Sequence, residues 1–265
     1  MSNTACIILA GGPGKRMASA DTPKVCFPVG GTPVIVRAID TYKQAGLGRF
    51  VVVVGNMAEQ VMETVAAVHP EVSFVYQAQA LGTGHAASVA VEALAAEGYR
   101  GTAVVAVGDM LTVPRVVRRV LARSSESGSA AVLTALPKAS RPNAGRIVPD
   151  GEGNIAGVVE LPDILRARDT GSRLVVGGET LSADEVEERS ETVNASLYAF
   201  EFPGLREALR QIEPDNAQSE LYLTDVVEVL ARSGRVEAVT VSEATDLMSF
   251  NTPAELAQVD EVFGR

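Results

Sequence analysis

Glycines and cations gather between residues 9 and 24 in an arrangement suited to a polyphosphate. The stretch from Leu9 to Met17 reads LAGGPGKRM and directly follows a short apolar run. Glycines let the backbone approach phosphates closely, so that its N–H groups can donate to them. Arg16 and Lys24 add a planar guanidinium and a compact ammonium for phosphate oxygens. A plain tight turn and a solvated surface lysine are the alternatives, and the spacing matches neither a Walker A motif nor Gly-x-Gly-x-x-Gly.

A second polar cluster follows the apolar run 72–76. It consists of Gln77 and the glycine-rich loop 81–84, which leads into a helix near His85. The Gln77 amide offers both a donor and an acceptor, which can match the edge of a nucleobase. Gly82 and Thr83 offer backbone groups for the same purpose, although Thr83 could simply cap the helix. We interpret His85 as a helix-start residue rather than a catalytic base.

Two oxygen-bearing side chains could hold a hard cation. Asp109 follows the buried run 103–107, where a lone carboxylate suits Mg²⁺, or simply ends the strand in a turn. Asn251 precedes Thr252-Pro253, where it either begins the final helix or lends its side-chain oxygen to the same cation. Two cysteines and two histidines are too few and too scattered for a zinc cage or a disulfide framework.

The elements that must position these residues alternate between strand and helix in the first half. Continuous apolar runs predict buried strands at 6–10, 50–54, 72–76 and 103–107. Apolar residues at helical spacing predict helices at 33–45, 58–68, 85–96 and 113–123, with a turn at 124–128. The pattern indicates an α/β fold with a doubly wound, mostly parallel, Rossmann-like sheet. Ligands of such sheets bind beyond the carboxyl ends of the strands, where the polar motifs lie.

The second half mixes both element types. Strands are predicted at 130–136, 146–148, 155–159, 193–200 and 236–241, and helices at 203–212, 221–232 and 253–262. The segment 162–190 has little periodicity and is predicted to be a long surface excursion, helical at most over 183–189. We expect one domain, 1–265, with a nucleotide-binding sublobe 1–125, a mixed α+β sublobe 126–250 that shares the sheet, and a closing helix in 251–265.

Composition limits the possible partners. The chain has 265 residues, 46% of them hydrophobic, which suffices for a sizeable core. Its 33 acidic and 23 basic residues give a net charge of −10, so it lacks the electrostatic footprint of a duplex nucleic-acid binder. No apolar stretch approaches the roughly 20 residues of a membrane span, and the N-terminus lacks the basic region of a signal peptide. We expect no nucleic-acid or membrane partner and a cytoplasmic location.

Taken together, these motifs and their order resemble the sugar-1-phosphate nucleotidyltransferase family, and within it the uridylyltransferase (UDP-N-acetylglucosamine pyrophosphorylase) type. The resemblance covers nearly the whole chain, from Ala5 to Leu256. Besides the motifs above, it rests on Gly145-Arg146-Ile147-Val148, Val158-Val159-Glu160, Asn194, Asn216-Ala217-Gln218 and Leu221-Tyr222-Leu223-Thr224-Asp225.

The resemblance implies a role for each matching position. The nucleotide would be held by Leu9, Ala10, Gly11, Gly12, Gly14, Lys15, Gln77, Gly82 and Thr83. Arg16 and Lys24 would act on its phosphates, and Asp109 and Asn251 would bind the catalytic Mg²⁺. The amino-sugar would contact Gly145, Glu160, Asn194 and Thr224. The implied substrates are UTP and N-acetylglucosamine 1-phosphate, or a close analogue. A sugar-phosphate oxygen would attack the α-phosphorus in line, giving a UDP-sugar and pyrophosphate without a covalent enzyme intermediate.

Several departures from the family pattern leave the sugar open. They are Ala10-Gly11-Gly12, Lys15, Met110-Leu111-Thr112, Asn194-Ala195-Ser196 and the longer segment 162–190. One alternative is a transferase that uses dTTP, CTP or GTP with another sugar phosphate. The other is a nucleotide-sugar sensor without catalysis, which the presence of Arg16, Lys24, Asp109 and Asn251 together disfavours. The chain shows no hexapeptide repeat, so we expect no acetyltransferase activity, and the oligomeric state stays open.

Overall fold

Four parallel strands form the part of the sheet that carries the glycine-rich motifs. The computed structural model describes residues 3–12, 14, 17 and 21–265. The strands are β1 (Thr4–Leu9), β4 (Arg49–Val54), β5 (Ser73–Tyr76) and β6 (Thr102–Val107), in the spatial order β5-β4-β1-β6. The chain moves outward from β1 to β5 and then crosses back to β6 on the other side of β1. Such a reversal of strand order is where ligands bind in open α/β sheets.

Strand β13 (Thr192–Glu201) joins this parallel block to the rest of the sheet. It runs antiparallel to β6 on one side and to β8 (Ala131–Pro137) on the other. Its register shifts between Asn194 and Tyr198, and Ser196 has a φ of 61°. Beyond this irregularity lie β14 (Val236–Thr240), parallel to β8, and the antiparallel pair β9 (Arg146–Pro149) and β10 (Ile155–Val159). The predicted α/β fold is confirmed, with a parallel block of strands in the first half of the chain and mixed pairing in the second.

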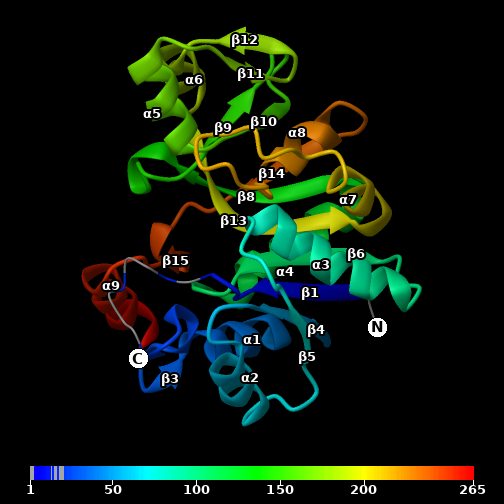
Figure 1. Ribbon diagram of the computed structural model, residues 1–265, viewed down its shortest axis with the longest axis vertical. Helices are drawn as coiled ribbons and strands as arrows, with labels where there is room; N and C mark the ends of the chain where they lie inside the picture. The colour runs from blue at the N-terminus through cyan, green and yellow to red at the C-terminus, as the bar shows by residue number, and fades with distance from the viewer. Residues whose placement is uncertain (1–2, 13, 15–16, 18–20) are drawn as a thin grey trace.

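Helices cover both faces of the sheet because side chains alternate along each buried strand. In β1, Cys6 and Ile8 enter one apolar core, whereas Ala5, Ile7 and Leu9 enter the other. The first core is covered by α1 (Val34–Gln44), α2 (Ala58–Ala66) and α4 (Pro114–Ser127). The second is covered by α3 (Thr83–Ala96), α7 (Phe202–Ala208) and α8 (Asp225–Ala231). Figure 1 shows the sheet between the two helical layers. None of the helices among the described residues is long and apolar enough to cross a membrane.

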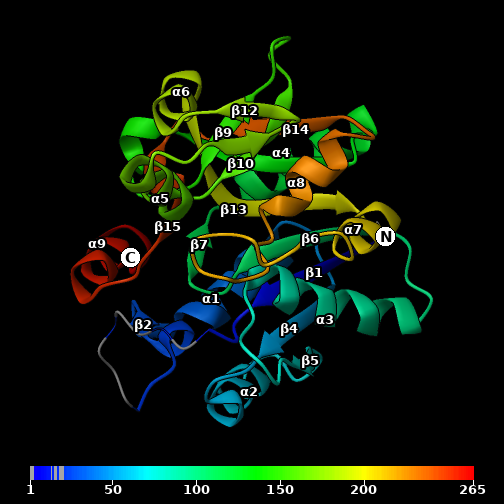
Figure 2. The same cartoon turned by 45° about the horizontal axis from the view of Figure 1, so that its top comes forward.

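The end of the chain returns to the carboxyl end of β6. Strand β15 (Leu247–Ser249) pairs antiparallel with β7 (Met110–Thr112), which starts three residues after β6 ends. Helix α9 (Pro253–Phe263) follows and contacts both β15 and the small hairpin β2 (Pro28–Val29)/β3 (Thr32–Pro33), as Figure 2 shows. Thr252 and Glu255 form a capping box at its start, with the Thr252 hydroxyl accepting from Glu255 N at 3.2 Å. The cap fixes the residue before it, Asn251, beside β6.

The segment 162–190 is not the irregular surface excursion that its weak periodicity predicts. It is covered by α5 (Leu161–Thr170), a hairpin of β11 (Leu174–Val176) and β12 (Glu179–Leu181), and α6 (Ala183–Arg189). These elements share a small core with β9 and β10, formed by Val148, Ala156, Val159, Ile164, Ala167, Val176, Leu181, Ala183 and Val186. Each short element contributes only one to three buried side chains, too few for a recognisable period. The segment is therefore a folded cap on the second lobe, at the top of Figure 1.

Three helices also begin or end at residues other than the predicted ones. Helix α4 continues through Ser127 and ends at Gly128, whose φ of 62° terminates it, so 124–128 is a last helical turn rather than a loop. Helix α7 ends at Ala208 rather than at 212. Helix α8 begins at Asp225 rather than at 221, because residues 221–224 instead contact the start of α3.

The folded cap predicts a difference between two adjacent residues of α5. Ile164 is fully buried, whereas Leu165 is 47% exposed. We expect Ile164→Ala to lower the free energy of unfolding by about 2–4 kcal/mol, because it leaves a cavity, and Leu165→Ala to change it by less than about 0.5 kcal/mol. Urea denaturation of both variants measures the difference. Equal effects would contradict the packed core described here.

Candidate functional site

Two cavities meet at the carboxyl end of β6. One, of about 460 Å³, opens beside the end of β1 and is called the β1 cavity. The other, of about 560 Å³, opens beside the end of β10 and is called the β10 cavity. Both are lined by Val107, Asp109 and Asn251. Molecules bound in the two cavities would therefore touch at these residues.

The β1 cavity gathers the residues predicted to bind a nucleotide. Those within the described chain all line it: Leu9, Ala10, Gly11, Gly12, Gly14, Lys24, Gln77, Gly82 and Thr83. Lys15 and Arg16 lie outside the described residues, so their predicted roles stay predictions. A Cβ atom on Gly11 would lie 2.9 Å from Gln77 Oε1. Glycine at this position thus allows the strand end to pack against a buried amide.

Gln77 fixes the shape of the loop that follows it. Its side chain is only 6% exposed, and its Nε2 donates to the Gly82 carbonyl at 3.2 Å and contacts His85 Nδ1 at 3.0 Å. Its oxygen lies near Gly11, which also lines the cavity. Gln77 therefore holds the loop as well as lining the cavity, and His85 is a helix residue that supports this amide.

The loop 216–222 closes one side of the β1 cavity. Gly84 N donates to the Leu221 carbonyl at 2.7 Å, and Leu221 N donates to the Leu81 carbonyl at 2.8 Å. The Thr83 hydroxyl accepts from Leu223 N at 3.0 Å and does not cap α3. This loop brings Gln218 and Glu220 into the cavity lining, two residues that the sequence reasoning missed. The motif at 216–218 was a usable signal, but only the fold shows which loop it meets.

Lys24, Asp109 and Asn251 come together where the cavities join. The Lys24 ammonium forms an ion pair with Asp109 and donates to Asn251 Oδ1 at 2.8 Å. It also lies 5.3 Å from the centre of the Phe250 ring, a favourable position for a cation. Three residues from distant parts of the chain thus form one charged contact, and both oxygens predicted to bind a metal face the same cation.

The two oxygens fit a hard cation in their chemistry. A carboxylate and an amide oxygen are donors that Mg²⁺ accepts, and Mg²⁺ commonly binds through one or two protein oxygens together with substrate phosphates. The described residues contain no cluster of three or more His, Cys, Asp or Glu side chains with metal-site geometry. Asp109 and Asn251 therefore suit a metal that arrives with a phosphate ligand.

The β10 cavity gathers three of the four predicted sugar-binding residues. Gly145, Glu160 and Asn194 line it, whereas Thr224 does not. The Thr224 hydroxyl instead donates to Glu160 Oε1 at 3.0 Å and orients that carboxylate. A Cβ atom on Gly145 would lie 3.0 Å from Glu160 Oε2, so the glycine allows this close approach.

Asn194 is buried and partly engaged by its own strand. Its Nδ2 donates to the Tyr198 hydroxyl at 2.6 Å, and its Oδ1 accepts from Ser196 N at 3.1 Å. These bonds hold the irregular stretch of β13 next to the cavity. The amide retains a second donor and a second lone pair, which can face a ligand.

Arg141 is a cation of the β10 cavity that the sequence reasoning missed. It is half-buried, and its Nη2 donates to Ser249 Oγ at 2.9 Å. It belongs to the loop 138–145, from which only Gly145 was singled out. An arginine before a proline in a short loop is a weak signal, because the sequence does not show that the loop faces a cavity.

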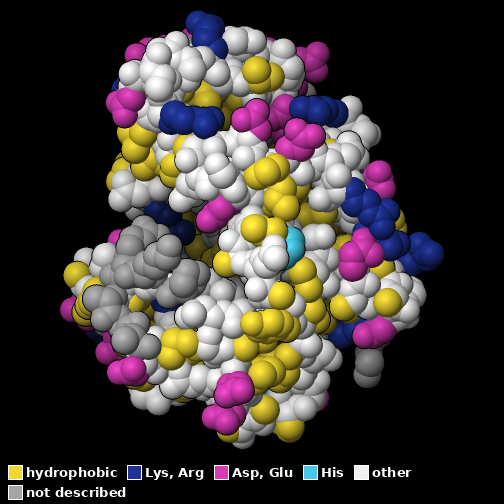
Figure 3. All heavy atoms as spheres, in the orientation of Figure 1, with side chains coloured by type: hydrophobic (Ala, Val, Ile, Leu, Met, Phe, Trp, Pro, Cys, Tyr) yellow, Lys and Arg dark blue, Asp and Glu magenta, His cyan; other side chains and the backbone are white. Residues whose placement is uncertain are grey.

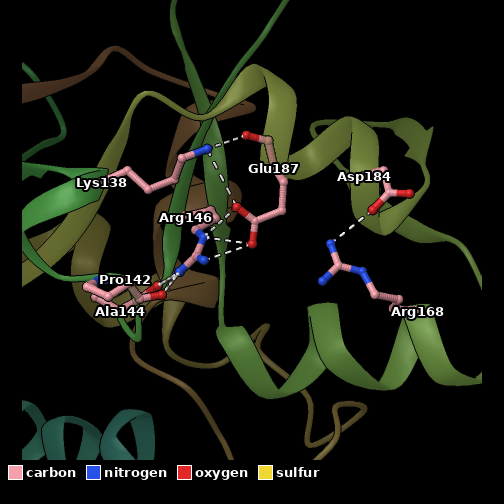
Figure 4. A network of polar contacts seen from close by, with 7 residues as sticks. All are labelled: Lys138, Pro142, Ala144, Arg146, Arg168, Asp184 and Glu187. Atoms are coloured by element: carbon pink, nitrogen blue, oxygen red, sulfur yellow. Dashed lines mark hydrogen bonds and ion pairs between the residues drawn. The ribbon is translucent and has the colours of Figure 1, made fainter.

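A buried network holds the loop that carries Arg141. Arg146, 5% exposed, donates to the carbonyls of Pro142 at 2.7 Å and Ala144 at 2.5 Å. Its guanidinium also pairs with Glu187 of α6 at 2.8 Å, and Lys138 donates to the Glu187 carbonyl at 2.5 Å. Figure 4 shows Lys138 and Arg146 converging on Glu187. The folded cap thus anchors both ends of the loop.

Carboxylates gather behind the β10 cavity. Burial raises the pKa of Glu160, and the nearby Asp163 raises it further, against the Thr224 hydrogen bond. Burial, with Asp163, Glu160 and Glu228 adding to it, raises the pKa of Asp225 to about 7. Asp163 itself accepts from Ala217 N at 2.6 Å and so ties α5 to the loop 216–222. Mutual repulsion in this group favours protonated carboxyls.

The surface charges are dispersed on the face shown in Figure 3. Lys and Arg side chains lie next to Asp and Glu side chains there rather than forming one basic field. Exposed groups also form ion pairs, for example Arg206 with Glu92 at 2.7 Å and Arg168 with Asp184 at 2.9 Å. The predicted absence of a nucleic-acid partner stays a prediction.

The chain is similar to several known proteins. The model of the MobA-like NTP transferase domain matches residues 6–149. The bifunctional protein GlmU of Geotalea uraniireducens (strain Rf4) is 31% identical over 264 residues, 99% of this chain and 53% of the relative. The bifunctional protein GlmU of Kineococcus radiotolerans is 36% identical over 258 residues, 96% of this chain and 48% of the relative. The chain spans about half the length of the curated relatives it matches.

A solved structure shares the fold. It is a putative glucose-1-phosphate thymidylyltransferase from Bacillus anthracis in complex with a sucrose, with a TM-score of 0.73. It is 20% identical to this chain, and the alignment covers 97% of this chain and 94% of that one. At this identity the likeness shows the fold alone, including the second lobe.

The raised pKa of Asp225 predicts a pH-dependent gain from Asp225→Asn. Because the pKa of the folded state, about 7, exceeds the ordinary value of 3.8, the wild type loses stability as the pH rises from about 4 through 7. An uncharged asparagine avoids this loss. We expect the variant's Tm to match the wild type at pH 4 and to exceed it by about 2–6 °C at pH 8.

Thermal unfolding between pH 4 and pH 8 measures this difference. The control is Asp169→Asn, which removes an exposed carboxylate on α5 and should show no such trend. A constant Tm difference across the range would mean that Asp225 titrates normally.

Proposed function

Because the chain belongs to the family of MobA-like NTP transferase domains, we propose that it is a nucleotidyltransferase that forms UDP-N-acetylglucosamine, or a close UDP-sugar, from UTP and the sugar 1-phosphate. The observation that supports this most directly is the junction of two cavities at Asp109 and Asn251. A transfer between two substrates needs two adjacent sites that share the point of reaction. This arrangement provides them.

In this proposal the β1 cavity takes the nucleotide. Backbone groups around Gly11 and Gly12 face the phosphates, because residues without a Cβ allow the closest approach. The Gln77 amide and the Gly82 loop face the base, whose edge they can match by hydrogen bonds. Arg16 is proposed to act with Lys24 on the triphosphate.

The β10 cavity takes the sugar 1-phosphate. Its polar lining, with Glu160, Asn194 and the Gly145 backbone, suits the hydroxyl and amide groups of an amino-sugar. Thr224 contributes by orienting Glu160. The resemblance found in the sequence is what favours N-acetylglucosamine over other sugars.

The proposed reaction is an in-line displacement. One oxygen of the sugar phosphate bonds to the α-phosphorus while the bond from that phosphorus to the bridging oxygen of pyrophosphate breaks. Asp109 and Asn251 would hold Mg²⁺, which when bound neutralises charge on the triphosphate and the leaving pyrophosphate. Lys24 sits at the same junction and contributes a positive charge there without transferring a proton. The protein's part is therefore positioning and neutralisation.

A second candidate keeps the site but changes the substrates. The solved structure of the same fold is a putative thymidylyltransferase, and thymine offers the same hydrogen-bonding edge as uracil. Glucose 1-phosphate with dTTP therefore belongs in the test. A nucleotide-sugar sensor without catalysis is the third candidate.

A substrate panel distinguishes the three candidates. Purified protein is incubated with Mg²⁺, each of UTP, dTTP, CTP and GTP, and each of several sugar 1-phosphates, and pyrophosphate release is measured. We expect UTP with N-acetylglucosamine 1-phosphate to give the highest kcat/KM. A preference for another pair would support the second candidate. No turnover, with tight binding of UDP-sugars, would support the sensor.

The junction predicts the effect of Asp109→Asn. The variant loses the negative charge that pairs with Lys24 and would hold Mg²⁺, so we expect kcat to fall by about 100- to 1000-fold. The folded state should persist, because Asp109 lies at the rim of two cavities rather than in the core.

Two measurements accompany the kinetics of this variant. Mg²⁺ together with UTP should raise the Tm of the wild type and of the exposed control Asp169→Asn, but raise that of Asp109→Asn much less. Near-normal turnover of Asp109→Asn would contradict the metal assignment.

A further inference from the structure

The proposed reaction has an electrostatic problem in the β10 cavity. A sugar 1-phosphate carries up to two negative charges, and it must approach a triphosphate in a chain of net charge −10. Its cavity is lined by three carboxylates, those of Asp109, Glu160 and Glu255. Placing a phosphate there is unfavourable unless a cation is present at the same place.

Each cavity has one lysine or arginine among its described lining residues. In the β1 cavity it is Lys24, and in the β10 cavity it is Arg141. Lys24 is already engaged by Asp109 and Asn251 on the side where the triphosphate is proposed to lie. The acceptor phosphate therefore has Arg141 as its candidate partner.

The guanidinium of Arg141 is kept available for an anion. It donates to a neutral hydroxyl, Ser249 Oγ at 2.9 Å, and among the described residues the carboxylates of Asp109 and Glu255 act on it through their charge and not through a hydrogen bond. Burial lowers its pKa, while the charges of Asp109 and Glu255 raise it. An arginine in a protein stays protonated, so the cavity holds a positive charge. Most N–H groups of this guanidinium remain available to donate to a ligand.

The backbone holds Arg141 close to the junction. Its partner Ser249 pairs in register with Met110, the residue after Asp109, and lies two positions before Asn251. Behind it, Arg146 and Glu187 fix the loop through the carbonyls of Pro142 and Ala144 (Figure 4). Because the Arg141 side chain is already held by these contacts, it loses little conformational entropy when it binds an anion. This makes it an effective positioning group.

We propose that Arg141 binds the phosphate of the acceptor sugar 1-phosphate and holds it toward the junction of the two cavities. The inference rests on the proposed function and adds to it the residue that handles the second anion. The planar guanidinium binds two phosphate oxygens, and a third oxygen is left to form the new bond to the α-phosphorus. Arg141 neither gains nor loses a proton, and the pyrophosphate leaves on the Lys24 side.

The test compares Arg141→Gln with the wild type in the active substrate pair of the panel. We expect the KM for the sugar 1-phosphate to rise about 10- to 100-fold, as for the loss of a hydrogen-bonded charge, and the KM for the nucleoside triphosphate to stay within about twofold. Arg141→Lys keeps the positive charge but loses the planar pair of donors. Its KM for the sugar 1-phosphate should therefore lie between those of the wild type and Arg141→Gln. Ser249→Ala, which removes the contact that orients Arg141, should raise the same KM by about three- to tenfold.

The control is Arg118→Gln, which removes one positive charge from an exposed site on α4 and should change neither KM. If the wild type is active and Arg141→Gln leaves the sugar-phosphate KM unchanged, or raises both KM values equally, the inference is overturned while the proposed function stands. If the wild type turns over no pair, the proposed function fails and the inference fails with it.

Discussion

The contact among Lys24, Asp109 and Asn251 is the constraint on which the site depends. It requires that β6 end beside β1, because only then does Asp109 face the glycine-rich turn. It also requires that the final helix begin at a fixed place, and the Thr252–Glu255 capping box together with the β7–β15 pairing provides this. The two cavities share a wall because these conditions are met at once. A strand register or helix start displaced by one residue would separate them.

The distribution of charge around this junction follows from the acidity of the chain. Two anionic substrates are proposed to bind where carboxylates already gather. Each cation near the cavities therefore has a large effect on how strongly an anion binds there. Among the described residues, one lysine and one arginine line the two cavities, whereas many other basic side chains form ion pairs at the surface. The carboxyls behind the β10 cavity limit repulsion in another way. Burial and the neighbouring carboxylates raise the pKa of Asp225 to about 7, so this group carries less negative charge near neutral pH than an ordinary aspartate would.

The sequence predicts the parallel block of the sheet well and the second lobe less well. Continuous apolar runs such as 50–54 and 103–107 are long enough to identify buried strands, and their alternation with helices determines the sheet type. The glycine-rich turn and Gln77 are recognisable because glycine runs and a glutamine are unusual residue types directly after a buried strand. The motif that contains Gln218 was recognisable, but its place in the β1 cavity and that of Arg141 in the β10 cavity were not, because both depend on contacts between distant loops. Local patterns carry no information about such contacts.

The segment 162–190 shows how a departure from a family pattern can act at a distance from the reaction. None of the residues 162–190 lines either cavity. Glu187 of α6 nevertheless holds the loop 138–145 through Arg146, and Asp163 of α5 holds the loop 216–222 through Ala217. One loop carries Arg141 into the β10 cavity, and the other carries Gln218 into the β1 cavity. A folded cap that supports one loop of each cavity can set their spacing. Changes in this cap can therefore shift the two loops without altering any residue that lines either cavity.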